Sequence, residues 1–293
     1  MAPSMNPSDL VEPDRERVIT CDLGLEIVER AEVALQITAS RSAGSLLDER
    51  FDVRLDGEPV VPVEVEGLHG TRIHVLRVGP GRLVVSYRGE LEVRRGAGTG
   101  TNPPGPSRDE DTSDYQRQLY LRPSRYCPSD HLVGFAVAEF SAAGGVAERV
   151  EAITSWIRER VGYVPGSSSV HDSAEHTLLT ATGTCRDFAH LGVALCRAVG
   201  IAARFAAVYA PGLSPMDFHA VFETLEEGRW LVHDATGLAP RQSLVRIATG
   251  RDAADTAFMA ILDGIVNFDT MEVSAIVGSV LPIDDLVSTV RLP

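Results

Sequence analysis

The sequence is poor in cysteine and in positive charge. Four cysteines in 293 residues, Cys21, Cys127, Cys185 and Cys196, lack the density and spacing of a disulfide framework, so free thiols in a reducing compartment fit better. Acidic residues outnumber basic ones by 41 to 27, the net charge is −14, and no basic run is longer than a pair. Nucleic acid and anionic membranes are therefore not expected as partners.

The sequence also lacks a secretory signal and a membrane span. Residues 1–15 are rich in proline, serine and acids, without the basic start and apolar stretch of a signal peptide, and are predicted to be a disordered N-terminus. The most apolar stretch, residues 191–210, is interrupted by Arg197 and Arg204 and is too polar for a bilayer. We therefore expect a cytoplasmic protein without a transmembrane helix.

What remains is a globular composition with two differently patterned halves. Hydrophobic residues make up 44% of the chain and charged residues 23%, which predicts a sizeable core. Residues 16–95 read as short β runs separated by turn signals such as Asp56-Gly57, the pattern of an antiparallel β-sandwich. Residues 96–113 contain almost nothing apolar and are predicted to be a flexible linker. Residues 114–293 would form a second domain.

The second half begins with a mainly helical pattern. One helix is predicted from four apolar residues that recur on a single face: Val146, Val150, Ile153 and Ile157. Another is predicted to begin at Thr184, which forms a capping box with Asp187. Strands are predicted over residues 202–209 and 220–234, the second folded into a hairpin at Glu227-Gly228.

Cys185 occupies a position that favours reactivity. If Thr184 is the N-cap, Cys185 is the first residue of the helix, where unpaired backbone N–H groups and the helix dipole favour negative charge on sulfur. Free cysteines are more often buried and inert, as expected for Cys196 in the middle of an apolar helix. Cys185 is therefore a candidate nucleophile.

A thiolate nucleophile needs a base and a third group that orients the base. If the turn at residues 226–229 sets the hairpin register, Asp234 lies opposite Val221, and His219 lies on the same face of the sheet, diagonal to Asp234. His233 would point to the other face. Because a slip of one residue would reverse these faces, the assignment depends on that turn.

Three segments that contain these residues closely resemble the core motifs of bacterial transglutaminase-like proteins. They are Gly-Thr-Cys-Arg-Asp-Phe-Ala-His-Leu at 183–191, Asp-Phe-His-Ala at 217–220 and Trp-Leu-Val-His-Asp-Ala-Thr at 230–236. The resemblance extends over about residues 115–269, and the β-rich stretch resembles the family's N-terminal domain. It implies an α+β protein in which a β-sandwich precedes a papain-like transglutaminase core. Within that core, Cys185, His219 and Asp234 would act as a triad.

The resemblance also implies a reaction, thiol-dependent acyl transfer through a thioester. Because relatives of this bacterial group are generally regarded as proteases, we favour hydrolysis of a peptide or amide bond in a peptide or protein substrate. An amine acceptor in place of water would make the protein a transglutaminase. A non-catalytic peptide- or partner-binding protein is the alternative of another class, and the intact triad argues against it. The sequence does not identify the second oxyanion donor beside the Cys185 N–H; Tyr163 and Trp156 are named only as candidates.

Other chemically suggestive residues have simpler explanations. Cys127 and His131 resemble half of a zinc site, but no second ligand pair occurs at zinc-site spacing. Residues 96–100 only loosely resemble a dinucleotide-binding loop, because the third glycine is wrongly spaced. Neither a metal nor a cofactor is expected. The remaining candidates are expected to be solvated loop or strand-edge residues: Ser167, Ser168, Ser169, His171, His176 and Asp217.

Overall fold

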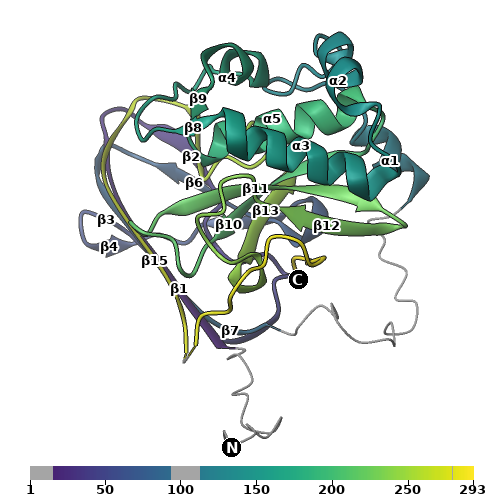
Figure 1. Cartoon of the computed structure of the whole chain (residues 1–293). Helices are drawn as coiled ribbons and strands as arrows, with labels where there is room; N and C mark the ends of the chain where they lie inside the picture. Colours follow the sequence, from purple (N-terminus) through teal and green to yellow (C-terminus); the bar gives the residue numbers. More distant parts are fainter. Residues whose placement is uncertain (1–15, 94–112, 279) are drawn as a thin grey trace, which may run out of the picture.

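The computed structural model describes residues 16–93, 113–278 and 280–293. The disordered N-terminus predicted over residues 1–15, the glycine-rich residues 96–100 and nearly all of the predicted linker lie outside the described residues. The described residues form a β-sandwich, a separate antiparallel sheet and a layer of helices (Figure 1). The predicted α+β class is therefore confirmed.

The sandwich consists of two antiparallel sheets, with strand orders β15-β1-β7-β3-β4 and β14-β2-β6-β5. Alternate residues of β1, such as Ile19, Cys21 and Leu23, are buried, because successive side chains of a strand point to opposite faces and one face is covered by the other sheet. The strands are β1 (Glu16–Ile27), β2 (Ala31–Leu35), β3 (Ser45–Leu55), β4 (Glu58–Pro59), β5 (Val63–Glu66), β6 (Arg72–Val78), β7 (Gly81–Glu92), β14 (Met259–Asp263) and β15 (Val266–Val277).

Two strands of this sandwich come from the far end of the chain. β15 pairs with β1 along its length, from Arg17↔Val277 to Ile27↔Val266, and β14 pairs with β2. The domain boundaries expected from the sequence, 16–95 and 114–293, therefore differ from the structure, which assigns β14 and β15 to the sandwich. An alternating apolar pattern shows that a segment is a strand, but not which distant strand it pairs with. The sequence therefore did not indicate that the end of the chain pairs with the N-terminal strands.

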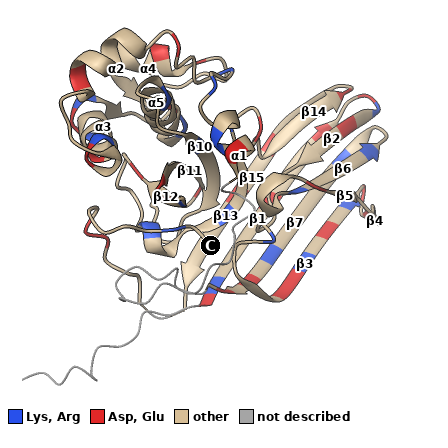
Figure 2. Cartoon of the chain, turned by 90° about the vertical axis from the view of Figure 1, so that its right-hand side faces the viewer, with Lys and Arg blue, Asp and Glu red and all other residues tan. Residues whose placement is uncertain are grey.

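The rest of the chain forms a second lobe around a sheet of order β12-β11-β10-β13. Helix α5 packs on β10 and β11, and helices α2 to α5 lie on one side of this sheet while the sandwich lies on the other (Figure 2). The elements are α1 (Asp114–Leu119), α2 (Val133–Phe140), α3 (Val146–Arg160), β8 (Gly162–Tyr163), α4 (Ala174–Thr180), β9 (Thr182–Gly183), α5 (Cys185–Ala198), β10 (Ala203–Tyr209), β11 (Phe218–Glu226), β12 (Arg229–His233) and β13 (Val245–Gly250). Among the described residues, none of the helices is long and apolar enough to cross a membrane.

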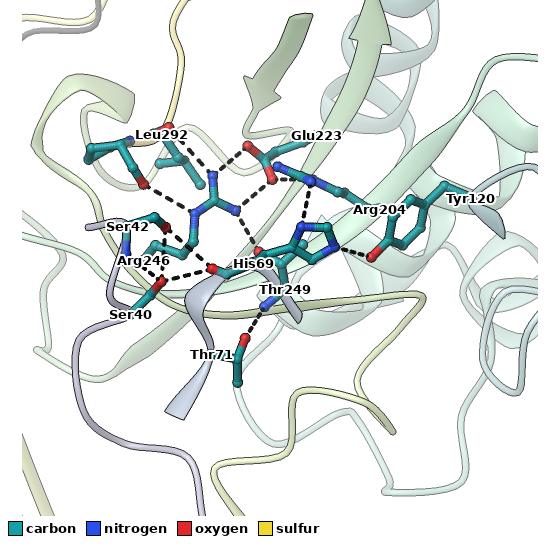
Figure 3. A network of polar contacts seen from close by, with 11 residues as sticks. Ser40, Ser42, His69, Thr71, Tyr120, Arg204, Glu223, Arg246, Thr249 and Leu292 are labelled. Atoms are coloured by element: carbon teal, nitrogen blue, oxygen red, sulfur yellow. Dashed lines mark hydrogen bonds and ion pairs between the residues drawn. The ribbon is translucent and has the colours of Figure 1, made fainter. Parts of the chain in front are cut away.

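A buried network of charged and polar groups lies where the two lobes meet (Figure 3). Glu223 of β11 is fully buried and accepts two hydrogen bonds of 2.8 Å from Arg246 and one of 2.7 Å from Arg204. Burial alone would raise the pKa of Glu223, but the two guanidinium groups hold it well below its usual value. Arg204 also contacts Nδ1 of His69 at 3.3 Å, and Nε2 of His69 lies 2.6 Å from the Tyr120 hydroxyl. Since His69 belongs to the sandwich, this network joins it to the strand that carries His219.

Candidate active site

Cys185 is the first residue of α5, as the capping pattern predicts. The carboxylate of Asp187 accepts the Thr184 backbone N–H at 2.8 Å and its hydroxyl at 3.0 Å. A Cβ at Gly183 would lie 2.6 Å from the Cβ of Asp187, so glycine leaves the room that this fold-back needs. Ser168 also donates to Asp187, at 3.0 Å, which gives this serine a structural partner. The Cys185 side chain therefore lies at the positive end of the helix dipole.

The hairpin of β11 and β12 has the register expected from its turn. Phe222 pairs with His233, and Nε2 of His219 lies 2.9 Å from Oδ2 of Asp234, with both side chains buried. His233 points away from this pair and contacts the Thr224 hydroxyl at 2.8 Å. The predicted pairing and the predicted separation of the two histidines are therefore confirmed.

Asp234 is held by more than the histidine. Its Oδ1 accepts the backbone N–H and the hydroxyl of Thr236, at 2.8 and 2.6 Å. Burial alone would raise the pKa of Asp234, but the charge of His219 and these hydrogen bonds lower it. Sequence reasoning did not assign a role to Thr236, although a threonine two residues after an aspartate is a signal for this local turn.

His219 is the residue that links Asp234 with Cys185 in the candidate site. Burial opposes its charged form, yet the charge and hydrogen bond of Asp234, helped by Cys185, raise the pKa of His219 to about 10. Because Asp234 occupies Nε2, Nδ1 is left for Cys185. That nitrogen is buried and makes no hydrogen bond among the described residues, while Cys185 is close enough to His219 to help raise its pKa. Cys185 itself is only partly buried, unlike the other three cysteines, which are buried.

The raised pKa predicts that His219 stabilises the fold in a particular pH range. A raised folded-state pKa contributes stability that is fully present below about pH 6.5, the unfolded value, and is lost as the pH rises toward about 10. Each unit of difference corresponds to about 1.4 kcal/mol, so wild type should lose several kcal/mol more than His219→Gln between pH 6 and pH 10. Urea unfolding of both proteins at the two pH values measures this difference. Parallel pH profiles would contradict it.

Tyr163 and Trp156 occupy different environments. Tyr163 of β8 lies beside the start of α5: burial and the charges of Cys185 and Asp217 raise its pKa, and a hydrogen bond with the Cys185 backbone opposes that shift. Trp156 instead packs its ring at 71° against Phe135, within the apolar core of the helical layer. Of the two oxyanion candidates, the structure brings Tyr163 to the nucleophile.

The half zinc site suggested by the sequence is not assembled. Cys127 is buried and its thiol donates to the backbone oxygen of His190 at 3.5 Å, whereas His131 is exposed and contacts Glu175 at 2.9 Å. His176 lies on helix α4, which corrects its expected place in a loop; the helix was missed because it spans only 7 residues. The other polar candidates are exposed, as expected: Ser167, Ser169, His171 and Asp217.

The chain matches known proteins in sequence and in fold. Residues 136–235, which include Cys185, His219 and Asp234, match the Transglutaminase-like superfamily. The crystal structure of a candidate cysteine protease from Cytophaga hutchinsonii superimposes with a TM-score of 0.83 and 32% identity, over 96% of this chain and 99% of that one. The chain therefore belongs to the transglutaminase-like superfamily of bacterial proteins, and its relatives support a thiol-dependent enzyme.

Two further matches are more distant. A protein of Mycobacterium leprae named ML0607 is 28% identical over 148 residues, which are 47% of this chain and 52% of that protein. The match therefore spans about half the length of this curated relative. The periplasmic domain of TgpA from Pseudomonas aeruginosa superimposes with a TM-score of 0.41 and 20% identity, over 82% of this chain and 97% of that one.

Proposed function

We propose that the protein is a cysteine hydrolase that cleaves a peptide or amide bond through a thioester on Cys185. In this proposal His219 is the acid and base, and Asp234 orients it. The observation that carries the proposal is the position of His219, whose Nε2 lies 2.9 Å from Asp234 and whose other nitrogen is left for Cys185. A nucleophile, a base and an orienting carboxylate in this order are what covalent acyl transfer needs.

The proposed reaction has two steps. The Cys185 thiolate, stabilised by protonated His219 and the start of α5, attacks the carbonyl carbon and forms a C–S bond. As the C–N bond breaks, His219 gives its proton to the departing amine or ammonia. In the second step His219 takes a proton from water, whose oxygen attacks the thioester. The acid leaves, and the thiolate and the protonated histidine are restored.

Tyr163 is proposed to donate a hydrogen bond to the oxyanion formed in both steps, together with the Cys185 backbone N–H, whose contact with the Tyr163 oxygen the oxyanion would replace. Removing one such donor typically lowers turnover by 10²–10³-fold, so Tyr163→Phe should lower kcat by about 100-fold with little change in KM. Steady-state kinetics on the substrate measures both constants. Tyr115→Phe, on an exposed tyrosine of α1, is the control and should match wild type. Equal kcat values for the two variants would remove Tyr163 from the mechanism.

The acceptor in the second step decides between hydrolase and transglutaminase. All basic residues of the chain other than histidine are arginines, so the protein offers no lysine ε-amine to its own thioester. Any isopeptide product in an assay must therefore involve an amine from another molecule. This makes the two outcomes separable with a simple mixture of acyl donor and amine.

The test uses casein whose lysines have been dimethylated, with dansylcadaverine as the only primary side-chain amine. Under the proposal, acid quenching traps an acyl group on Cys185, and the Cys185→Ala variant shows no such adduct. Mass spectrometry of the products then identifies casein fragments or deamidated glutamine, without dansyl incorporation. Dansyl incorporation that exceeds hydrolysis would identify an amine acceptor. No adduct and no product, with the protein folded, would favour the non-catalytic binding alternative.

A further inference from the structure

A continuous aromatic surface leads from the proposed active site onto the sandwich. Phe218, which immediately precedes His219, lies with its ring centroid 5.5 Å from that of Phe258, and Phe258 lies 6.2 Å from Phe268. Phe268 belongs to β15 of the sandwich, and 47% of its surface is exposed. We call these three residues the aromatic ledge. Phe218 directly precedes His219 in β11, and because successive side chains of a strand point to opposite faces, the ledge lies beside the strand end that carries His219 rather than against its ring.

The chain segments next to the ledge also carry exposed apolar residues. Met216, two residues before Phe218, is 45% exposed, and β14 and the turn that follows it expose Ile261, Leu262 and Ile265 by 44%, 59% and 49%. Single exposed apolar residues are ordinary, but a contiguous group typically marks a surface that binds another molecule. The described residues leave this surface uncovered, so we look for its occupant outside them.

The strand that carries Phe268 suggests an extended occupant. β15 is at the end of its sheet and pairs with β1 alone, so in the part of the chain that the structure describes its other edge has no strand beside it. A polypeptide in the extended conformation can hydrogen-bond to such an edge while alternate side chains enter apolar sites.

The charge beside the ledge indicates a cationic group on the occupant. Asp217 lies between Met216 and Phe218 and is exposed, and the cation whose charge acts on it among the described residues is His219, not an arginine. Its carboxylate accepts the Phe218 backbone N–H at 2.7 Å, which fixes it at this end of the ledge. A lysine or arginine of a bound peptide would give it a direct ion pair.

We infer that the aromatic ledge is the docking surface for an extended segment of the polypeptide substrate. The segment places aromatic or large aliphatic side chains on Phe258 and Phe268 and a basic side chain beside Asp217. This inference rests on the proposed function for the identity of the occupant as substrate, whereas the binding itself requires no catalysis. The sandwich thereby takes part in substrate selection.

The test measures peptide binding in the Cys185→Ala background, where turnover cannot interfere. Three fluorescent peptides of glycine and serine carry a central glutamine. In the first peptide, phenylalanine and arginine flank the glutamine on both sides. The second has serine in place of phenylalanine, and the third has glutamine in place of arginine. Fluorescence anisotropy should show binding of the first peptide about tenfold tighter than the second, the effect of burying part of an aromatic side chain. Phe268→Ser should abolish that difference, and Asp217→Asn should abolish the preference for arginine.

Ile276→Ser is the matched control, because Ile276 lies on the same strand with 46% exposure and should leave both preferences unchanged. Equal binding of the three peptides would overturn the inference. So would sedimentation of the wild type as a dimer that Phe268→Ser dissociates, because a second copy would then occupy the ledge. Turnover by the Cys185-containing protein is measured separately. If the protein binds the peptides with the expected preferences but never turns over a substrate, the ledge is supported and the proposed function is wrong. If it turns over a substrate but binds the three peptides equally, the proposed function is supported and the ledge is wrong.

Discussion

Replacing His219 with alanine is expected to lower turnover of an amide substrate by at least about 10⁴-fold, nearly as far as replacing Cys185 does. The physical reason is that neither residue works alone. Without His219 the thiolate loses its stabilising charge and the leaving amine loses its proton donor; without Cys185 no acyl intermediate forms. The double variant should therefore be little slower than either single variant, since residues that act as a unit have losses that do not add. Single-turnover kinetics of the three variants measures this.

Two hairpin variants provide the internal comparison. Asp234→Asn should preserve the fold and lower turnover, because an amide can hold the imidazole ring but cannot stabilise its charged form as a carboxylate does. His233→Ala should be milder, since His233 contacts Thr224 and Glu226 on the opposite side of the hairpin. If His233→Ala were as inactive as His219→Ala while Asp234→Asn kept full activity, the proposed third member of the triad would be wrong.

The parts of the site that the sequence predicts are those governed by short-range rules. The capping box of Thr184 and Asp187 fixes where α5 begins, and a two-residue turn fixes the register that brings Asp234 to His219. Both are interactions between neighbours in sequence, so their geometry follows from spacing. Thr236 also obeys a local rule, and attention to the residues after Asp234 could have found it.

The parts that were not predicted depend on contacts between distant segments. The pairing of β15 with β1 joins the two ends of the chain, and alternation alone names no partner for either strand. The network around Glu223 is even harder to predict from the sequence, because a glutamate, two arginines and a histidine are ordinarily surface residues. Only the fold shows that they are buried together. The same holds for the aromatic ledge, whose three phenylalanines come from three separate segments.

The fold connects this network to the proposed active site through a single strand. β11 begins with Phe218 and His219, and Glu223 lies four residues further along it. The sheet that must hold His219 therefore has one of its two interior strands tied to the sandwich through buried charges. Any loosening at Glu223 removes a constraint from the strand that presents the histidine.

Glu223→Gln should consequently be among the most destabilising single substitutions in the protein. It leaves Arg204 and Arg246 buried beside a neutral amide, and breaking a buried ion pair by removing one partner typically costs 3–5 kcal/mol, because the remaining charge is left uncompensated. Urea unfolding followed by circular dichroism gives the loss directly. The control is Glu32→Gln, which removes an ion pair with Arg77 on the sandwich surface and should leave the unfolding midpoint nearly unchanged, because solvent screens exposed pairs. If Glu223→Gln were no more destabilising than Glu32→Gln, the buried charges would have to be compensated by water or by other groups. The junction would then contribute little to holding His219 in place.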